Sequence, residues 1–164
     1  MSAVLAASSS LLLRLRIDQF YADYAACLDD DRLEDWPDFF VADSTYGVWS
    51  RENADAGLPA PLFFCRNRNM LKDRVIAHRE ANFFPVHWNR HFISAIRITG
   101  RRDDEFEVRS NYLIVQTRQD GVSFIYQAGA AHDRLVDISG ELKIAGRRII
   151  YDTLRVETLF VTPV

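Results

Sequence analysis

The architecture of this chain follows from the stretch LDDDRLEDWPDFF (Leu28–Phe40) and from YGVWSREN (Tyr46–Asn53) shortly after it. Three consecutive aspartates near its start cannot extend an apolar helical face, so a preceding helix is predicted to end there. Trp36, Phe39 and Phe40 then recur at i, i+3 and i+4, which places three large rings on one side of a short helix. One turn of helix is unstable by itself. We therefore expect the rings to be anchored at one end of a larger sheet.

Upstream of this stretch, an amphipathic helix is predicted over Ser10–Leu28. Its apolar positions recur at helical spacing and are Ile17, Phe20, Tyr21, Tyr24 and Leu28. Residues 1–10 are expected to fray. Met1–Leu13 lacks the basic start of a secretory signal and is interrupted by serines, so we do not interpret it as a leader.

Downstream, short elements alternate with two long loops. The loops are predicted at Asn53–Pro61, which holds Gly57, Pro59 and Pro61, and at Glu80–Trp88. The short elements are a strand at Thr45–Arg51, a brief strand at Leu62–Cys65 and a helix at Met70–His78, capped by Asn67 or Asn69. Long irregular loops are often contact surfaces.

From His91 onward the pattern is that of strands. The predicted strands are His91–Thr99, Glu105–Arg118, Val122–Leu135, Leu142–Asp152 and Leu154–Thr162. Small residues at 128–131, including Gly129, predict a bulge or a close approach of two backbones.

Helices followed by many strands predict an α+β fold. Few helices can cover a sheet of about six strands only if the sheet curls. We expect a cone-shaped, strongly curved, mostly antiparallel sheet with two to three N-terminal helices on its concave side. Residues 1–164 are expected to form a single domain, because a chain of this length buries a sufficient core.

Composition excludes several classes of protein. The formal net charge is -3, with 20 basic residues scattered among 23 acidic ones, so a nucleic-acid binder is not expected. No stretch approaches the ~20 apolar residues of a membrane span. The two cysteines, Cys27 and Cys65, lie in apolar surroundings and are interpreted as free thiols in the cytoplasm.

The histidines offer a weak metal signal. His87 and His91 have the i, i+4 spacing of a zinc helix, but Pro85 and the following strand pattern place them on extended chain. Four extended residues span about 13 Å, which is too far for one ion. No Cys-x-His pair is present for a Rieske-type cluster. We expect no catalytic, cofactor or metal site in this chain.

Acid–base catalysis inside the cone is an alternative. Residues that could face such a pocket are Tyr24, Tyr46, Asp29, His78 and His91. The other interpretation is that these tyrosines belong to the core and that His91 bonds locally. A dehydratase or isomerase using Tyr24 and His91, or a ligand-binding protein, therefore stays open.

Arginines beside the long loops and aromatic residues point to a subunit interface. The candidates for polar anchoring within or between subunits are Trp36, Arg51, Glu52, Asn53, Arg74, Arg79, Arg90 and His91. A solvated face of mixed charge is the competing interpretation.

The chain resembles the small (β) subunit of bacterial aromatic-ring-hydroxylating dioxygenases. The residues that carry the resemblance are Leu28-Asp29-x-x-Arg32-Leu33-Glu34-x-Trp36-Pro37-x-Phe39-Phe40, Tyr46, Arg51-Glu52-Asn53, Gly57-Leu58-Pro59, Met70-Leu71-x-Asp73-Arg74-Val75, Arg79-Glu80-Ala81-Asn82, Arg90-His91 and Val108-Arg109-Ser110-Asn111-Tyr112. They follow in order from the first helix to beyond the middle of the sheet. The C-terminal third matches in pattern only.

The resemblance implies the cone fold of nuclear-transport-factor-2-like and scytalone-dehydratase-like proteins. It also implies a non-catalytic assembly subunit in an α3β3 hexamer, with a β3 ring formed through the sheet face and large subunits docked on the loops. The large subunit would carry the Rieske [2Fe–2S] cluster and the mononuclear iron. Electrons would come from NAD(P)H through a reductase, with or without a ferredoxin. The departure at Ala128–Ile138 favours a branch acting on aromatic acids such as salicylate or terephthalate.

Overall fold

The fold is seen in a computed structural model that describes residues 2–81, 85–153 and 163–164. In chain order its elements are α1 (Ser2–Asp29), η1 (Trp36–Phe39), β1 (Phe40–Ser50), α2 (Arg51–Asp55), β2 (Phe63–Cys65), α3 (Arg68–Glu80), β3 (His87–Arg102), β4 (Glu105–Arg118), β5 (Ser123–Ile138) and β6 (Glu141–Tyr151). The strand predicted at Leu154–Thr162 lies outside the described residues.

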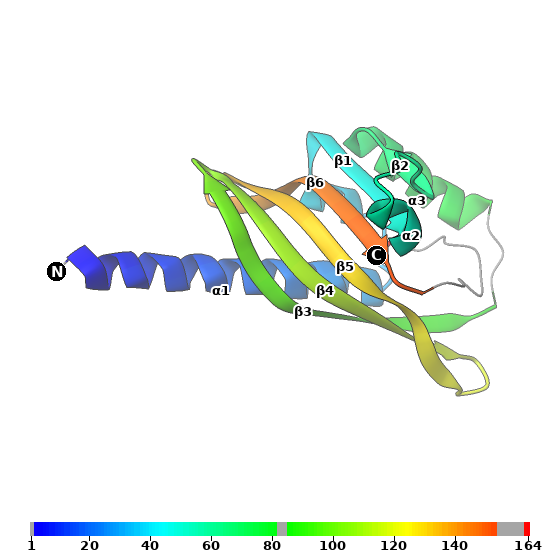
Figure 1. The fold of residues 1–164 in the computed structure, drawn as a ribbon. Coiled ribbons are helices and arrows are strands. Elements are labelled where there is room, and N and C mark those ends of the chain that lie inside the picture. Colours follow the sequence, from blue (N-terminus) through cyan, green and yellow to red (C-terminus); the bar gives the residue numbers. More distant parts are fainter. Residues whose placement is uncertain (1, 82–84, 154–162) are drawn as a thin grey trace.

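The strands form one mixed sheet in the order β2-β1-β6-β5-β4-β3. Neighbouring strands are antiparallel except β1 and β6, which run parallel. Figure 1 shows α1 crossing one face of a sheet of long, bent strands, with α3 beside β1 and β2. We call the face toward α1 the inner face and the opposite one the outer face. This arrangement confirms the predicted α+β class with a curved, mostly antiparallel sheet.

The acidic stretch ends α1 through a defined backbone motif. Asp31 adopts the left-handed conformation, with a φ of 57°. The Arg32 N–H donates to the Cys27 carbonyl at 2.9 Å, and the Asp31 N–H donates to the Leu28 carbonyl at 3.2 Å. This pair of bonds is the Schellman arrangement that closes many helices. The helix therefore ends at Asp29, within one residue of the predicted position.

Several boundaries differ from those predicted. The helix α1 begins at Ser2 rather than near Ser10, in keeping with the alanines and leucines of this stretch, which are strong helix formers. Fraying of residues 1–10 stays a prediction. The aromatic turn is a 3-10 helix with proline in its first turn, and β1 already begins at Phe40. Part of the first predicted loop is the helix α2, since the Ser50 hydroxyl accepts a hydrogen bond from the Asn53 N–H.

Bulges and a close approach bend the long strands. In β3 the register shifts between Ser94 and Arg97, and Ala95 between them has a φ of 50°. A shift of this kind bends the strand and increases its twist. At Gly129 in β5, an added Cβ would lie 2.9 Å from the Tyr112 hydroxyl and closer still to the Ile150 carbonyl oxygen. The close backbone approach predicted at 128–131 is confirmed at this glycine.

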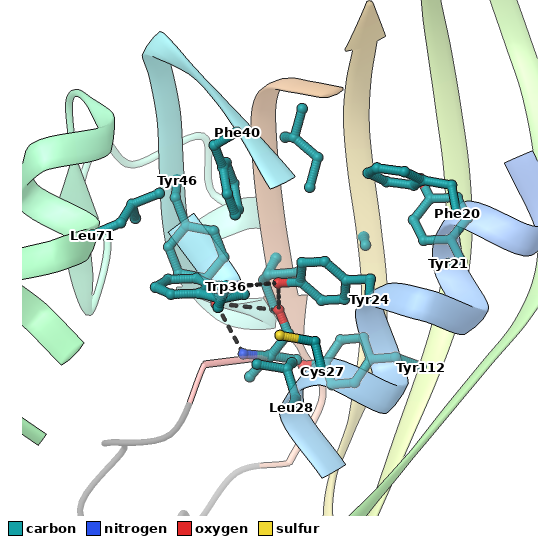
Figure 2. Close-up of a cluster of buried hydrophobic side chains, with 14 of the residues drawn as sticks. Phe20, Tyr21, Tyr24, Cys27, Leu28, Trp36, Phe40, Tyr46, Leu71 and Tyr112 are labelled. Carbon is teal, nitrogen blue, oxygen red and sulfur yellow. Dashed lines mark hydrogen bonds between the residues drawn. The ribbon is translucent and has the colours of Figure 1, made fainter. Parts of the chain in front are cut away.

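The core lies between α1, η1 and the inner face of the sheet. Edge-to-face ring pairs connect these elements, among them Phe39 with Tyr24 and Trp36 with Tyr46, at centroid distances of 5.4 and 5.3 Å. Figure 2 shows the rings of Tyr24, Trp36, Phe40 and Tyr46 gathered between α1 and the sheet. The N-terminal turns of α1 extend past the end of the sheet in Figure 1, and Leu11 and Leu12 are exposed there. Of the helices described, none has the length and apolarity to cross a lipid bilayer.

Candidate functional site

The interior of the curved sheet holds a hydrogen-bonded group built around Val164. The Tyr24 hydroxyl donates to the Val164 carbonyl at 2.8 Å and accepts from the Trp36 indole N–H at 2.9 Å. The Tyr46 hydroxyl accepts from the Val164 N–H at 3.0 Å and lies 3.2 Å from its carbonyl oxygen. These hydrogen bonds appear as dashed lines at the centre of Figure 2. The three rings are fully buried. We call these residues, together with Tyr21, Asp133 and Arg147, the interior hub.

A buried ion pair completes the hub. Arg147 on β6 donates from Nη1 to Asp133 Oδ2 on β5 at 2.7 Å, and its Nε lies 3.3 Å from the Val164 carbonyl oxygen. The Tyr21 hydroxyl donates to the same carboxylate oxygen at 2.7 Å, and the guanidinium lies 4.6 Å from the Tyr24 ring centre. Both charged side chains are almost completely removed from solvent. Such a pair is tolerated only because each charge has a partner and further hydrogen bonds.

Burial sets the protonation of the hub. Desolvation raises the pKa values of Tyr21 and Tyr24, so both hydroxyls stay protonated at neutral pH. Desolvation also raises the pKa of Asp133, while the Arg147 charge and the Tyr21 hydrogen bond lower it. The tyrosines therefore act as hydrogen-bond donors that hold Asp133 and Val164. Each of these groups has a hydrogen-bond partner inside the protomer, and Asp133 is held through Oδ2 while its Oδ1 has none among the described residues.

A second polar cluster surrounds the acidic turn, which we define as Asp29–Asp38. The Asp29 carboxylate accepts from the His91 backbone N–H at 3.0 Å and lies 2.7 Å from His91 Nδ1. Arg90 donates to the Asp29 backbone carbonyl at 3.3 Å. The Arg90-His91 pair therefore fastens β3 to the end of α1.

Arg79 fastens α3 to the same turn. Its Nε and Nη2 donate to the two carboxylate oxygens of Glu34 at 2.8 and 3.0 Å, and its Nη1 donates to the Asp31 carboxylate at 2.7 Å. A further bond to the Asp31 carbonyl, at 2.8 Å, supports the left-handed backbone there. Hydrogen bonding from Arg79 lowers the pKa of Glu34 to about 2. Arg79 thus acts as an internal tie between helices.

The remaining predicted anchors lie apart from this cluster. Trp36 belongs to the interior hub. Arg51 forms a two-pronged contact with Asp152, at 2.8 and 2.6 Å to the same oxygen. The Asn53 amide donates to the Ala60 carbonyl at 2.9 Å, and Glu52 is exposed in the first turn of α2. The Arg74 guanidinium lies 3.7 Å from the Phe63 ring centre.

The structure separates the residues that a stand-alone enzyme would combine. Tyr24 belongs to the interior hub, whereas His91 belongs to the cluster at the acidic turn. A groove of about 560 Å³ between α1 and β3 is lined by His91 and Tyr21, and a hollow of about 300 Å³ is lined by Asp29 and His78. Tyr24 and Tyr46 line neither of these spaces. The geometry gives no support to a shared acid–base site at Tyr24 and His91.

The donor set does not fit a metal centre. Within residues 2–81, 85–153 and 163–164, no group of three or more His, Cys, Asp or Glu side chains could hold an ion. His87 and His91 both lie on the extended strand β3. Desolvation raises the pKa of the Cys27 thiol to about 11, and it raises that of Cys65 as well. A protonated thiol is a poor ligand.

Sequence reasoning missed the centre of the hub. Asp133 and Arg147 lie on strands whose alternation places them on the inner face, opposite each other in the register. That inward position of two opposite charges was the available signal. No sequence pattern placed Val164 between two tyrosines, because this contact joins residues more than 110 positions apart.

Comparison with known proteins places the chain in a family. Residues 24–158 match the family model described as the ring-hydroxylating beta subunit. The chain belongs to this family. It is 46% identical over 141 residues to the anthranilate 1,2-dioxygenase small subunit of Burkholderia cepacia, covering 86% of this chain and 88% of that one. The resemblance noted from the acidic stretch onward is thereby confirmed.

Two further relatives agree with this assignment. The terephthalate 1,2-dioxygenase terminal oxygenase component subunit beta 2 of Comamonas sp. is 29% identical over 153 residues, with 93% of this chain and 99% of that one covered. The crystal structure of a beta subunit from a proposed aromatic-ring-hydroxylating dioxygenase of Novosphingobium aromaticivorans superimposes with a TM-score of 0.87. It shares 46% identity and covers 95% of this chain and 99% of that chain.

Proposed function

We propose that this chain is the non-catalytic assembly subunit of the terminal oxygenase of an aromatic-ring-hydroxylating dioxygenase. It would pair with a large subunit in an α3β3 hexamer, forming a β3 ring through the sheet face and docking large subunits through its loops. The observation that supports this proposal most directly is the hydrogen bonding inside the curved sheet. Tyr24, Tyr46, Asp133 and Arg147 are all occupied with one another or with Val164, so the groups fit for chemistry serve to hold the fold.

The chemistry would belong to the partner. The large subunit is proposed to carry the Rieske [2Fe–2S] cluster and the mononuclear iron, with electrons from NAD(P)H delivered by a reductase. A scaffold that keeps neighbouring large subunits in register would set the distance for electron transfer between them. We place the complex in the cytoplasm, where the free thiols Cys27 and Cys65 would stay reduced.

The substrate is proposed to be an aromatic carboxylate. Two relatives are named for the oxidation of anthranilate and terephthalate, and both compounds are aromatic acids. The first shares 46% identity with this chain. Substrate selection would still be tested on the complex, because the proposed iron site lies in the large subunit.

Co-purification tests the proposal directly. The tagged chain is expected to pull down from its native cells a larger, reddish iron–sulfur subunit, in equal amounts by densitometry and with a hexamer mass by light scattering. The eluted complex should consume O2 when an aromatic acid and a reductant are supplied. A colourless species without a partner would overturn the assembly role.

A further inference from the structure

Four basic residues form one cross-strand row on the outer face of the sheet. Arg97 on β3 pairs with Arg109 on β4, Arg109 pairs with His132 on β5, and His132 pairs with Arg148 on β6. Arg109, His132 and Arg148 alternate with buried inward-facing neighbours such as Val108 and Ala131, and Arg97 lies between the partly buried Ile96 and Ile98. We call Arg97, Arg109, His132 and Arg148 the basic row. It lies on the opposite face of the sheet from the interior hub.

The guanidinium groups of this row are exposed, and they have no carboxylate partner among the described residues. Arg97, Arg109 and Arg148 are exposed to solvent, whereas His132 is half-buried. Arg148 stacks over the Trp49 ring at 5.0 Å from its centre. In the described part of the chain, no carboxylate is within ion-pair distance of these three arginines. Within the described residues, the sheet therefore presents positive charge here without a carboxylate partner.

Such a row is costly for an isolated protomer. Like charges directly opposite each other on neighbouring strands destabilise a sheet. The positive charges also affect His132. Its pKa is lowered first by desolvation and then by the charges of Arg109, Arg148 and Arg51. Several other arginines of this chain have local carboxylate partners, as Arg79 has in Glu34 and Asp31 and Arg147 has in Asp133. The missing counter-charge points to an external partner.

The surroundings of the row are those of a contact surface. Next to it along the strands lie small side chains in register, Ser94, Asn111 and Ala130, which allow close approach. Beyond them lies an apolar patch made of Phe92 and Leu113, followed by Ile125 across from Val115. Phe92 and Ile125 are 54% and 63% exposed. Apolar residues flanked by arginines are typical of protein interfaces.

We propose that the basic row docks the acidic turn of a second copy of this chain, in a head-to-tail contact. The carboxylates available for this contact are those of Asp30, Asp35 and Asp38, whose side chains are 61%, 63% and 71% exposed. Their internal contacts to Arg32 and Arg68 are long, at 3.4 to 3.9 Å. The row and the turn therefore complement each other in charge.

Symmetry favours a second copy as the occupant. A closed ring of three needs a heterologous interface, in which two different patches of one chain meet. The basic row lies on the outer face of the sheet, whereas the acidic turn follows α1, which packs on the inner face. The two patches are therefore different surfaces of one chain, as a heterologous interface requires. The contact rests on the proposed ring and specifies which surfaces build it.

The test uses the full chain by itself, without a large subunit. Sedimentation velocity at ~0.1 M salt is expected to show a trimer for the wild type. The double charge reversal R109E/R148E should dissociate it to monomer, and adding D35K/D38K to the same chain should restore the trimer. Raising the salt to ~1 M should weaken the wild-type trimer, because screening shortens the reach of these charges.

Matched controls make the outcome decisive. The pair R101E/R102E makes the same change of charge at exposed positions of the β3–β4 hairpin, outside the row, and should leave the trimer intact. If R109E/R148E lowers the melting temperature, the neutral pair R109Q/R148Q replaces it, with partial dissociation expected. A wild-type chain that is monomeric alone, or an R109E/R148E trimer, overturns this contact. If R109E/R148E stays a trimer but no longer co-purifies with the large subunit, the row contacts that subunit instead. In that case the head-to-tail contact is overturned, while co-purification of the wild type with an iron–sulfur partner still supports the proposed function.

Discussion

Arg147 illustrates how a single residue holds several elements together. Its guanidinium bonds to Asp133 on the neighbouring strand, reaches the Val164 carbonyl and lies over the Tyr24 ring on α1. Removing one member of a buried ion pair leaves the other charge without compensation, which typically costs about 3–5 kcal/mol. Replacing both members with apolar side chains of similar volume is far milder.

We therefore expect Asp133→Asn to lower the free energy of unfolding by about 3 kcal/mol or more. The asparagine keeps the size but leaves Arg147 buried without a counter-charge. The double variant D133L/R147M should recover a large part of that loss. Urea denaturation followed by circular dichroism measures both. A D133N variant as stable as the wild type would show that solvent reaches the guanidinium.

The exposed network at Arg79 predicts a dependence on pH. The pKa of Glu34 is about 2 in the folded chain, below its ordinary value of 4.5. Between these two pH values, the unfolded chain therefore binds more protons than the folded chain. The stabilisation is present above pH ~4.5 and is lost as the pH falls toward 2. Because Glu34 is largely exposed, we expect Arg79→Ala to cost no more than about 1 kcal/mol at pH 7.

The stability difference between wild type and R79A should shrink as the pH falls from 5 toward 2, measured by urea unfolding at several pH values. Arg32→Ala is the matched control, because Arg32 makes only long contacts to exposed aspartates, at 3.4 and 3.9 Å. A pH-independent difference would mean that Arg79 acts through packing rather than through charge.

At the scale of single residues, sequence patterns singled out candidate residues but not the partners that they contact in the fold. Arg79, Arg90 and His91 were selected as interface candidates because they lie beside the long loops and aromatic residues, and the structure brings all three to the acidic turn. Whether the exposed members also contact another subunit stays a prediction. Side-chain pairing over 45 to 62 positions depends on tertiary geometry, which local patterns do not contain.

Among the elements, β5 shows the tightest steric requirement. Gly129 lies where the β6 backbone and the Tyr112 hydroxyl leave no room for a Cβ. We expect Gly129→Ala to destabilise the chain by about 1–3 kcal/mol, as overpacking does in cores. Thermal unfolding by calorimetry measures the loss. Ala130→Ser, one residue further along, is the control and should change stability by less than about 0.5 kcal/mol. Equal stability of the two variants would show that β6 can move away.

Elements were predictable where one local signal dominates. The strands β4 and β5 follow from alternation, and the end of α1 follows from its aspartates. The start of β1 and the helix α2 were missed, since β1 pairs with β6 about 100 residues away and α2 depends on a hydroxyl cap at Ser50. Such signals appear only once the partners are in place.

For the molecule as a whole, we expect one cooperative unfolding transition. The interior hub connects α1, η1, β1, β5 and β6 through shared hydrogen bonds, so these elements should unfold together. Far-UV circular dichroism and the fluorescence of Trp36, isolated in a W49F/W88F variant, should report the same urea midpoint. Separate midpoints would contradict the single domain predicted from the length of the chain.

The function of the whole molecule was predicted from the family resemblance and not from any catalytic motif in the sequence. Residue types alone left acid–base catalysis by Tyr24 and His91 open, and the structure places these two residues in separate clusters. The basic row was invisible in the sequence, because its four members come from four strands and share one line only after the register is fixed. Large, many-stranded surfaces of this kind require the fold.

The position of Val164 also has a consequence for biosynthesis. Its backbone forms hydrogen bonds with Tyr24 on α1 and with Tyr46 on β1. It is synthesised 140 residues after Tyr24 and 118 residues after Tyr46. The aromatic core therefore cannot close while position 164 is still inside the ribosomal exit tunnel. A nascent chain stalled just after that position should remain sensitive to protease, and lengthening the tether beyond it should confer resistance.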